Sequence, residues 1–356
     1  MSKFKIGDTV IGDGHPAYFI ADIAANHDGS LEKAKELIWM AKEAGADAAK
    51  FQHFKSKTIV SEHGFNTLGK QLSHQSAWKK SVCEVYKDAE VPLDWTADLA
   101  QTCKQAGIDF FTTPYNFECI DEVDEYVPAY KIGSGDITHH DLIAEICKKN
   151  KPVMIATGAS DLNDVISVIS LLSKKTNDLV LMQCNTNYTA SLENFRFINL
   201  SVLKTYGLLF PDVILGLSDH TPGHSTVLGA IALGAKVIEK HFTNDNDLVG
   251  PDHKFSMNPK SWREMVERSR ELEAALGSPA KKIEDNEKET YIVQRRSLRL
   301  KYKMKKDQKL SRADIIALRP CTDNGLYPYE IEKLIGRTLS KDMEEGEELT
   351  QESFLV

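Results

Sequence analysis

The chain has 356 residues, 42% of them hydrophobic and 27% charged, with a formal net charge of −8 at pH 7. This ordinary composition favours a soluble globular protein with one large and one smaller domain, and the acidic balance argues against nucleic acid as a partner. The first residues lack the apolar core of a signal peptide and no apolar stretch is long enough to cross a membrane, so we expect a cytoplasmic protein that binds no membrane.

The first part of the chain predicts a short hairpin and then a repeated strand and helix pattern. Two extended segments around Gly12-Asp13-Gly14 form the hairpin-like start. Apolar, strand-like stretches follow, each ending in Gly, Ser, Thr or a charged residue. These stretches begin at Tyr18, Ala46, Ile108, Ala129, Pro152, Leu179, Val213 and Ala235.

Helical periodicity fills the segments between the predicted strands. Ser30 is the expected N-cap of a helix that runs to Ala44. One helix is expected near residues 192–206 and a last one from Pro259 to Leu276. A longer polar insertion, from Ser56 to about Val91, interrupts the alternation.

About eight strand-then-helix units fit an α/β fold of the (β/α)8 TIM barrel type. The rival is a doubly wound open sheet, which usually has fewer strands and a glycine-rich nucleotide fingerprint after the first. The turn after the first strand is Asn26-His27-Asp28-Gly29, without that fingerprint. We therefore expect a barrel over residues 1–280, with its site among the C-terminal ends of the strands.

The end of the chain predicts a separate small module. Residues 281–290 are charged and poor in large apolar side chains, which is typical of a linker. Short extended pieces are then expected at residues 297–301, 315–319 and 339–341. Residues 291–356 are near the lower size limit for an independent core, so we expect this module to dock on something larger.

Two histidines follow neighbouring predicted strands. His220 comes after the apolar run from Val213, and His241 ends the run from Ala235, with Asp219 and Glu239 nearby. Either histidine alone is more simply a hydrogen-bonded residue at a strand end. The C-terminal ends of parallel strands share one face, however, so the pair favours a divalent-metal site.

Two lysines, Lys50 and Lys131, also stand at predicted strand ends, beside hydroxyl and glycine residues. Ammonium groups and backbone N–H groups both favour dianions, so this pattern predicts a cradle for phosphate and carboxylate. Either lysine alone could be a surface cation with its stem along the protein. A dianion beside a bound metal suggests a phosphorylated acid that meets a polarised carbonyl.

Seven motifs, in order along the chain, resemble the sialic acid synthase family, the phosphoenolpyruvate-dependent nonulosonate synthases. They are Ala21-Asp-Ile-Ala-Ala-Asn-His-Asp-Gly-Ser30, Lys50-Phe-Gln-His-Phe-Lys55, Thr113-Pro114, Tyr130-Lys-Ile-Gly-Ser-Gly-Asp136, Gly216-Leu-Ser-Asp-His-Thr221, Glu239-Lys-His-Phe-Thr243 and Gly250-Pro-Asp252. The tail, with Arg295-Arg-Ser-Leu298 and Leu318-Arg319-Pro320, resembles the C-terminal antifreeze-like (SAF) domain of that family. The resemblance covers nearly the whole chain.

This resemblance implies a C–C bond-forming transferase. Phosphoenolpyruvate would condense with the open-chain aldehyde of N-acetylmannosamine or a related acetamido hexose, and water would add, giving a nine-carbon 2-keto acid and phosphate. By similarity, His220 and His241 would bind a divalent metal, typically Mn²⁺ with Mg²⁺ or Co²⁺ as alternatives. The family also implies a domain-swapped homodimer.

The resemblance assigns roles to further residues. The phosphoenolpyruvate-binding residues would be Lys50, Gln52, Thr113, Lys131, Ser134 and Ser218. The catalytic candidates are Asp22, Glu239, Asp136 and Lys50, with the division of proton transfer and water positioning among the carboxylates left open. The sugar would contact Tyr188 and Asp252, and Arg319 would bind its N-acyl group from the partner subunit.

Three positions depart from the common family pattern. Asp22 stands where many members have Glu, Ala156 replaces a frequent Ser, and Thr186 sits where many have Asn. Thr157 or the Gly158 amide would substitute for the lost serine donor. These changes leave the reaction class intact and the exact sugar open, and the Gly-Ser-Gly-Asp form at 133–136 leans towards sialic and legionaminic rather than pseudaminic acid synthases.

Two other function classes fit parts of the sequence. A Schiff-base aldolase on the same barrel would use Lys131 or Lys50 as its nucleophile and need no metal. A binding protein would use the 290–356 tail as its ligand module and the barrel as a scaffold. The same condensation on a different aldose is a third alternative.

Overall fold

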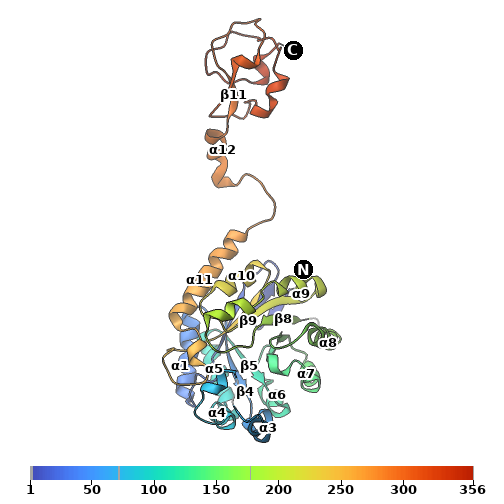
Figure 1. Cartoon of the computed structure of the whole chain (residues 1–356), viewed down its shortest axis with the longest axis vertical. Coiled ribbons are helices and arrows are strands. Elements are labelled where there is room, and N and C mark those ends of the chain that lie inside the picture. The colour runs from blue at the N-terminus through green and yellow to red at the C-terminus, as the bar shows by residue number, and fades with distance from the viewer. Residues whose placement is uncertain (1–2, 71–72, 177, 356) are drawn as a thin grey trace. The chain divides into compact units, whose positions relative to one another are not determined.

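Eight parallel strands form the centre of the first of two units, Met1–Gly277 and Ser278–Val356 (Figure 1). The structure is a computed structural model that describes residues 3–70, 73–176 and 178–355. The eight strands are β3 (Tyr18–Asp22), β4 (Ala48–His53), β5 (Asp109–Pro114), β6 (Tyr130–Ile132), β7 (Val153–Ala156), β8 (Leu179–Cys184), β9 (Ile214–Asp219) and β10 (Val237–His241).

The strands close almost completely into a barrel. Their hydrogen-bonded order is β5-β4-β3-β10-β9-β8-β7-β6, and the two end strands, β5 and β6, contact each other. Strands β3, β8 and β10 are buried along their whole length, because their side chains alternate between the barrel interior and the surrounding helices. The predicted TIM-barrel fold is confirmed.

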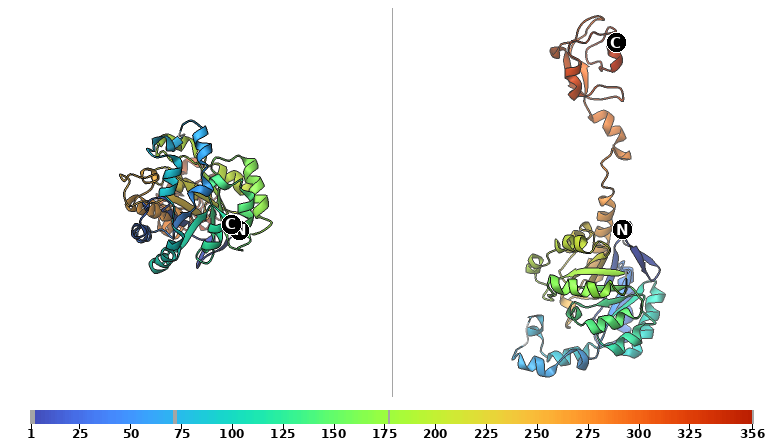
Figure 2. Two further views of the ribbon diagram at one scale, coloured as in Figure 1. Left: turned by 90° about the horizontal axis from the view of Figure 1, so that it is seen from below. Right: turned by 90° about the vertical axis from the view of Figure 1, so that its right-hand side faces the viewer.

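Helices surround the strands, as the end-on view shows (Figure 2). Five of them start at side-chain caps, Ser30, Asn116, His139, Asp161 and Asn258, which accept hydrogen bonds from backbone N–H groups of the first turn. The helices are α1 (Leu31–Glu43), α5 (Thr96–Ala106), α6 (Phe117–Val123), α7 (His140–Cys147), α8 (Leu162–Leu172), α9 (Val202–Leu209), α10 (Ser225–Ala232) and α11 (Pro259–Leu276).

One predicted helix, near residues 192–206, is wrong as a single element. The structure has a 3₁₀ helix, η4 (Leu192–Phe197), followed by α9. Between them Asn199 has a φ of 49°, in the left-handed region that a continuous right-handed helix does not allow. Periodicity alone did not indicate this interruption.

An N-terminal hairpin covers the end of the barrel opposite the C-terminal strand ends. Strand β1 (Lys3–Ile6) pairs antiparallel with β2 (Thr9–Gly12), so the turn lies at residues 7–8 and not around Gly12-Asp13-Gly14 as expected. Gly7 has a φ of 55°, which suits a glycine in a tight turn. Ile6 and Ile11 are fully buried and pack into the inner barrel core.

The polar insertion forms a helical layer at the C-terminal end of the barrel. It follows β4 and contains α2 (Ser56–Ile59), α3 (Glu62–Thr67), the 3₁₀ helix η1 (Ser73–Ala77) and α4 (Val82–Asp88). Figure 2 shows these light-blue helices projecting at the end of the barrel away from the N-terminus. The insertion therefore lies on the side of the barrel where the strands end.

The second unit has a small core of its own. Strands β11 (Ser297–Leu300) and β12 (Ile315–Leu318) pair antiparallel, and helix α12 (Lys288–Gln294) precedes them. Leu300, Leu339 and Leu349 are among its fully buried side chains. The extended piece expected at 339–341 is not a strand, since Leu339 forms only a single bridge, with Phe354.

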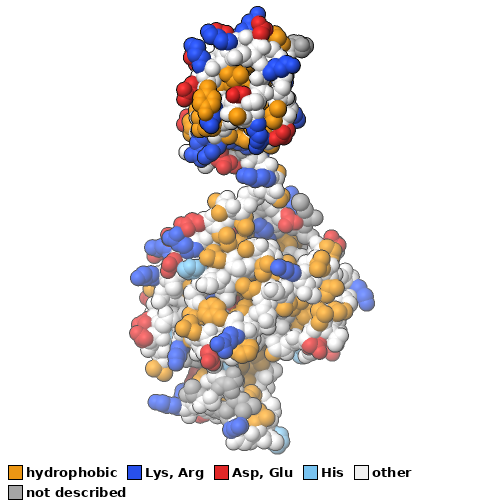
Figure 3. Space-filling view, turned by 45° about the horizontal axis from the view of Figure 1, so that its top comes forward, with side chains coloured by type: hydrophobic (Ala, Val, Ile, Leu, Met, Phe, Trp, Pro, Cys, Tyr) orange, Lys and Arg blue, Asp and Glu red, His pale blue; other side chains and the backbone are white. Residues whose placement is uncertain are grey.

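Two features were sought among the described residues: a membrane-spanning helix and a basic surface stripe. No described helix combines the length and the apolar character that a membrane span requires. On the face drawn in Figure 3, Lys and Arg side chains alternate with Asp and Glu, so that face carries no continuous basic stripe.

Candidate active site

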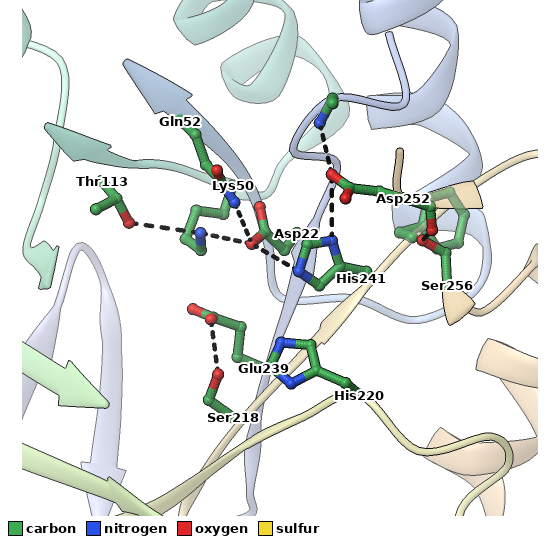
Figure 4. Close-up of polar contacts among 12 residues, drawn as sticks. Asp22, Lys50, Gln52, Thr113, Ser218, His220, Glu239, His241, Asp252 and Ser256 are labelled. Atoms are coloured by element: carbon green, nitrogen blue, oxygen red, sulfur yellow. Dashed lines mark hydrogen bonds and ion pairs between the residues drawn. The ribbon is translucent and has the colours of Figure 1, made fainter. Parts of the chain in front are cut away.

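Two buried lysine–carboxylate pairs stand at the C-terminal ends of the central strands, and Figure 4 draws the first of them, Lys50 with Asp22. Lys50 Nζ on β4 lies 2.7 Å from Asp22 Oδ2 on β3. Lys131 Nζ on β6 lies 2.9 Å from Glu239 Oε1 on β10. The four charged side chains are almost inaccessible to solvent. The barrel thus brings together residues that are up to 217 positions apart in the chain, 22 and 239 being the most distant.

The two carboxyl groups of these pairs differ electrostatically. Burial raises the pKa of Asp22, and the nearby Glu239 adds to that rise while Lys50 opposes it. Burial would also raise the pKa of Glu239, but Lys131 and Lys50 outweigh it and hold the pKa at about 2. Glu239 is therefore an anion and Asp22 is the more easily protonated of the two.

Polar side chains surround the lysine pairs. Gln52 Nε2 donates to Asp22 Oδ2 at 3.1 Å, and Lys50 Nζ is 3.5 Å from Thr113 Oγ1. Ser218 Oγ donates to Glu239 Oε1 at 3.1 Å. Ser134 Oγ accepts the Gly158 amide at 3.0 Å. We call Asp22, Lys50, Gln52, Thr113, Lys131, Ser218 and Glu239 the lysine centre.

His220 and His241 lie beside this centre, with ring centroids 5.4 Å apart. The His220 Nδ1 lies 3.0 Å from the carbonyl oxygen of Asn185, and this contact orients the ring. Nε2 is the ring nitrogen that this contact does not use. His241 Nε2 is 3.7 Å from Asp22 Oδ2, and its Nδ1 is 3.8 Å from Asp252 Oδ2. Burial lowers the pKa of His241 to about 3, so its imidazole is neutral.

The chemistry of these donors fits a divalent metal ion. Three buried atoms have no hydrogen-bond partner: Asp22 Oδ1, Glu239 Oε2 and His241 Nδ1. Burying an unpaired polar atom costs free energy unless a bound ligand supplies its partner. Within the described ranges no cluster of three or more His, Cys, Asp or Glu side chains could enclose a metal by itself. Two imidazole ligands would leave further coordination positions to water and substrate oxygen, the arrangement of an open catalytic site.

Asp219 does not belong to this site, contrary to the expectation that it would lie near the histidines. Successive side chains of a strand point to opposite faces, so Asp219 points away from His220 and towards the helices. There it binds Lys240 Nζ at 2.5 Å and accepts the hydroxyls of Thr221 and Thr226 at 2.8 and 2.7 Å. This buried pair joins β9 to β10 directly behind the two histidines.

Tyr188 and Asp252 border the histidine pair, as their predicted contact with a sugar requires. The Tyr188 ring centroid is 4.4 Å from that of His220, and Asp252 Oδ2 accepts the Ala25 amide at 3.2 Å. Asp136 is half-buried in the turn after β6, and among the described residues it forms no side-chain hydrogen bond with the lysine centre. Arg319 is exposed in the second unit.

Thr157 and the Gly158 amide were expected to substitute for the serine missing at Ala156, but both already have hydrogen-bond partners. Thr157 Oγ1 donates to the Met182 carbonyl at 3.1 Å and lies 3.0 Å from Tyr206 Oη. The Gly158 amide donates to Ser134 Oγ. A Cβ on Gly158 would stand 1.9 Å from Thr186 Oγ1, so the Thr186 side chain occupies the space that a side chain here would need.

A cleft of about 1080 Å³ opens from the histidine side of the centre. Tyr188 and Phe255 line it and also contact the histidines, with 4.8 Å between the ring centroids of Phe255 and His241. The insertion supplies much of the remaining wall, including His74 and Trp78. Sequence reasoning missed these insertion residues and Phe255, because none of them ends a predicted strand.

Comparison with known proteins gives concordant matches. Residues 37–281 match the NeuB family model, and residues 295–355 match the SAF domain model. The N,N'-diacetyllegionaminic acid synthase of Legionella pneumophila is 36% identical over 96% of this chain and 95% of that protein. Human N-acetylneuraminate-9-phosphate synthase is 32% identical over 96% of this chain and 94% of that protein. The solved N-acetylneuraminic acid synthetase from Leptospira borgpetersenii has a TM-score of 0.72 and 27% identity, covering 81% of this chain and 95% of that chain.

Proposed function

Because the chain belongs to the NeuB family and ends in a SAF domain, we propose that it condenses phosphoenolpyruvate with an open-chain acetamido hexose. The products would be a nine-carbon 2-keto sugar acid and inorganic phosphate. The similarity to enzymes that make sialic and legionaminic acids supports the general reaction.

The observation that carries this proposal is the contact between two different half-sites. The lysine centre offers two ammonium groups for a phosphorylated acid, and the two histidines beside it offer imidazole ligands for a metal. Asp22 contacts both half-sites, because its Oδ2 lies 2.7 Å from Lys50 Nζ and 3.7 Å from His241 Nε2. An anionic donor and a carbonyl acceptor would therefore meet within reach of one carboxyl group.

In this proposal Lys50 and Lys131 bind the phosphate and carboxylate groups of phosphoenolpyruvate, assisted by Gln52, Thr113, Ser134 and Ser218. Asp22 and Glu239 hold the two ammonium groups in place through these ion pairs while no substrate is bound. Their buried environment contains little water, which strengthens every charge contact with the bound substrate.

A divalent ion, with Mn²⁺ our proposal, would be held by His220 and His241 and would polarise the sugar aldehyde as a Lewis acid. Asn185 would fix the orientation of His220 through its carbonyl oxygen. Tyr188 and Asp252 would hold the sugar against the histidine side, where both residues lie.

The condensation forms a bond between C3 of phosphoenolpyruvate and the aldehyde carbon, and water oxygen then bonds to C2. The C2–O bond to phosphate breaks, so the bridging oxygen leaves with phosphate. On the way to the C2 carbonyl the attacking water loses two protons: the new alkoxide gains one, and the other leaves on the phosphate. Asp22, Glu239 and Asp136 are our candidates for these transfers, and Asp22 is the best supported because it borders both half-sites.

The subunit arrangement is also part of the proposal. Arg319 lies in the second unit, and we propose that it reaches the N-acyl group of the sugar in the partner subunit of a domain-swapped homodimer. The synthase would act in the cytoplasm, where phosphoenolpyruvate is available.

Mass spectrometry of reaction products tests the proposal. The protein would be incubated with phosphoenolpyruvate, Mn²⁺ and a panel of aldoses that includes N-acetylmannosamine, with and without chelator. We expect a nine-carbon acid and equimolar phosphate, both lost with chelator. A product that survives the chelator, together with borohydride trapping of a lysine in the presence of a keto acid, would instead establish the Schiff-base aldolase.

A further inference from the structure

The buried ion pair of Asp219 and Lys240 is also the last residue pair in the register between β9 and β10. Along the two strands the pair is flanked by four residues of the candidate site: Ser218, His220, Glu239 and His241. Figure 4 shows the side chains of these four residues lying close together. Since neighbouring strand residues face opposite ways, the ion pair stands directly behind both proposed metal ligands.

The two histidines are held in place by different means. His241 belongs to β10, and its carbonyl oxygen accepts the Met257 amide at 2.8 Å. His220 is the first residue after β9, where the register with β10 has ended. The Asn185 carbonyl orients its ring, at 3.0 Å from Nδ1. The backbone position of His220 therefore depends on what holds the residue that follows it.

The ion pair holds that following residue, Thr221, at both ends of its backbone. The Thr221 amide donates to Asp219 Oδ1 at 3.2 Å, and the Thr221 carbonyl accepts from Lys240 Nζ at 2.6 Å. Asp219 Oδ2 accepts from Lys240 Nζ at 2.5 Å and from Thr226 Oγ1 on α10 at 2.7 Å. All four residues are buried, so water does not compete for these contacts. His220 thus lies between two residues that Lys240 binds directly.

Stability alone is a weak reason for burying this lysine. Replacing a buried ion pair by apolar side chains of similar volume often leaves stability unchanged or raises it. Apolar side chains could not bind the Thr221 carbonyl, however. The position of His220 would then no longer be tied to the strand that carries His241.

A metal site made of two imidazoles depends on that tie. The ring centroids of His220 and His241 are 5.4 Å apart, so both rings can serve one ion only while this spacing is kept. Functional groups must be held to within about 0.5 Å of their working geometry. Residues that orient metal ligands from outside the coordination shell change metal affinity by about 10–100-fold when they are replaced.

Resting on the metal role in the proposed function, we infer that Lys240 and Asp219 are positioning residues that set the spacing of His220 and His241 before the ion binds. Lys240 acts on His220 through the Thr221 carbonyl and on His241 through the β10 backbone that they share. Neither positioning residue contacts the ion or the substrates, because both side chains lie behind the strands.

Mn²⁺ titration by electron paramagnetic resonance, without either substrate, tests this inference on the full chain. The double variant Asp219→Asn/Lys240→Met buries no charge and lacks the ammonium group that binds Thr221. We expect its stability to remain close to that of the wild type while its Mn²⁺ affinity falls at least about tenfold. Lys236→Met is the matched control. Lys236 precedes β10 at the opposite end of the strand and donates to the His15 carbonyl at 3.0 Å, so its loss should leave the affinity unchanged.

A purely structural ion pair predicts a different result, with Mn²⁺ affinity restored together with stability in the double variant, and that result would overturn the inference. The titration does not depend on turnover. A wild type that binds Mn²⁺ and forms no nine-carbon acid would remove the proposed reaction, and the inference would stand on the affinities of the variants. A wild type that binds no divalent ion would remove the metal role and the inference with it.

Hydrogen exchange on the unmutated protein keeps the inference testable if the double variant does not fold. In the metal-free protein, peptides that contain Thr221 should exchange slowly, and Mn²⁺ should add little protection, because the ion pair already holds this backbone. Fast exchange of these peptides that becomes slow only with Mn²⁺ would show that the metal positions His220, and the inference would be wrong.

Discussion

The lysine centre differs in what holds its side chains from the cleft lined by Tyr188, Phe255, His74 and Trp78, which we call the insertion cleft. The lysine centre stands on strands of one barrel sheet, in which only β5 and β6 are hydrogen-bonded on a single side, and its lysine and carboxylate side chains are buried and paired. The insertion cleft is walled by short helices and loops, and its aromatic residues His74, Trp78 and Tyr188 are only half-buried. Rigid strand ends suit a reaction that needs fixed charges, and loops suit the choice among related substrates.

The first prediction tests the rigidity of the strand ends through the Asp219–Lys240 pair. Lys240→Met should destabilise the barrel by about 3–5 kcal/mol, because it leaves the Asp219 carboxylate buried and uncompensated. Denaturant unfolding measures the loss. Asp219→Asn combined with Lys240→Met should recover most of it, since no charge then remains.

Lys35→Met is the matched control for that variant. Lys35 pairs with exposed carboxylates on the surface, so its loss should change stability by less than about 1 kcal/mol. Equal losses for Lys240→Met and Lys35→Met would mean that the strand ends are not fixed by their buried charges, and the contrast with the insertion cleft would disappear.

The second prediction separates the reaction from the choice of sugar. His241→Ala should lower metal affinity by more than the ~10–100-fold that loss of an outer-shell partner costs, and turnover of every aldose should fall with it. Metal titration by electron paramagnetic resonance with Mn²⁺ measures the affinity directly. A variant that still binds Mn²⁺ tightly, or that loses turnover of only one sugar, would show that His241 is not a metal ligand needed for the reaction.

The third prediction concerns a contact supplied from outside the barrel. Arg319→Ala should raise the KM of the sugar by an amount that corresponds to ~2 kcal/mol, a charged hydrogen bond, with little effect on kcat. Mixed dimers of Arg319→Ala and His241→Ala subunits should regain activity, because one of the two sites then has both residues intact. Failure of the mixture to regain activity, with dimers present, would place Arg319 in its own subunit's site or in none.

The fourth and smallest prediction is a pH effect at the strand that leads into the insertion. Burial lowers the pKa of His53 to about 3, and its ring nitrogens lie 2.7 and 2.9 Å from the hydroxyls of Thr112 and Thr96. The unfolded chain takes up this proton near pH 6.5 and the folded barrel does not. The full contribution of neutral His53 is therefore present above pH 6.5 and is lost as the pH falls towards 3.

We expect stability to fall by roughly 1.4 kcal/mol per pH unit through this group below pH 6.5. Urea unfolding at pH 7, 6 and 5 measures the slope, and His53→Gln should make it shallower. His63→Gln, exposed on α3, is the control. An unchanged slope in His53→Gln would show that other groups control the acid sensitivity of the strand ends.

Sequence reasoning found the lysine centre and missed the insertion cleft for a physical reason. Parallel strands end on one face of the barrel. Lys50, Lys131 and His241 could therefore be assigned to one site from their strand positions alone. The same logic erred for Asp219, because adjacent strand residues face opposite ways and the exact end of β9 decides which faces inward. His74 and Trp78 lie in an insertion without periodicity, and only the folded chain brings His74 between Trp78 and Tyr188.

The most direct test of the central proposal follows the bridging oxygen of phosphoenolpyruvate. With ¹⁸O in the C2–O–P bridge, condensation by C–O cleavage sends the label into inorganic phosphate and leaves the nine-carbon acid with oxygen from water at C2. We predict that outcome, with product formation abolished in Lys131→Met. Label retained in the organic product, or product formed without phosphate release, would contradict the proposed reaction.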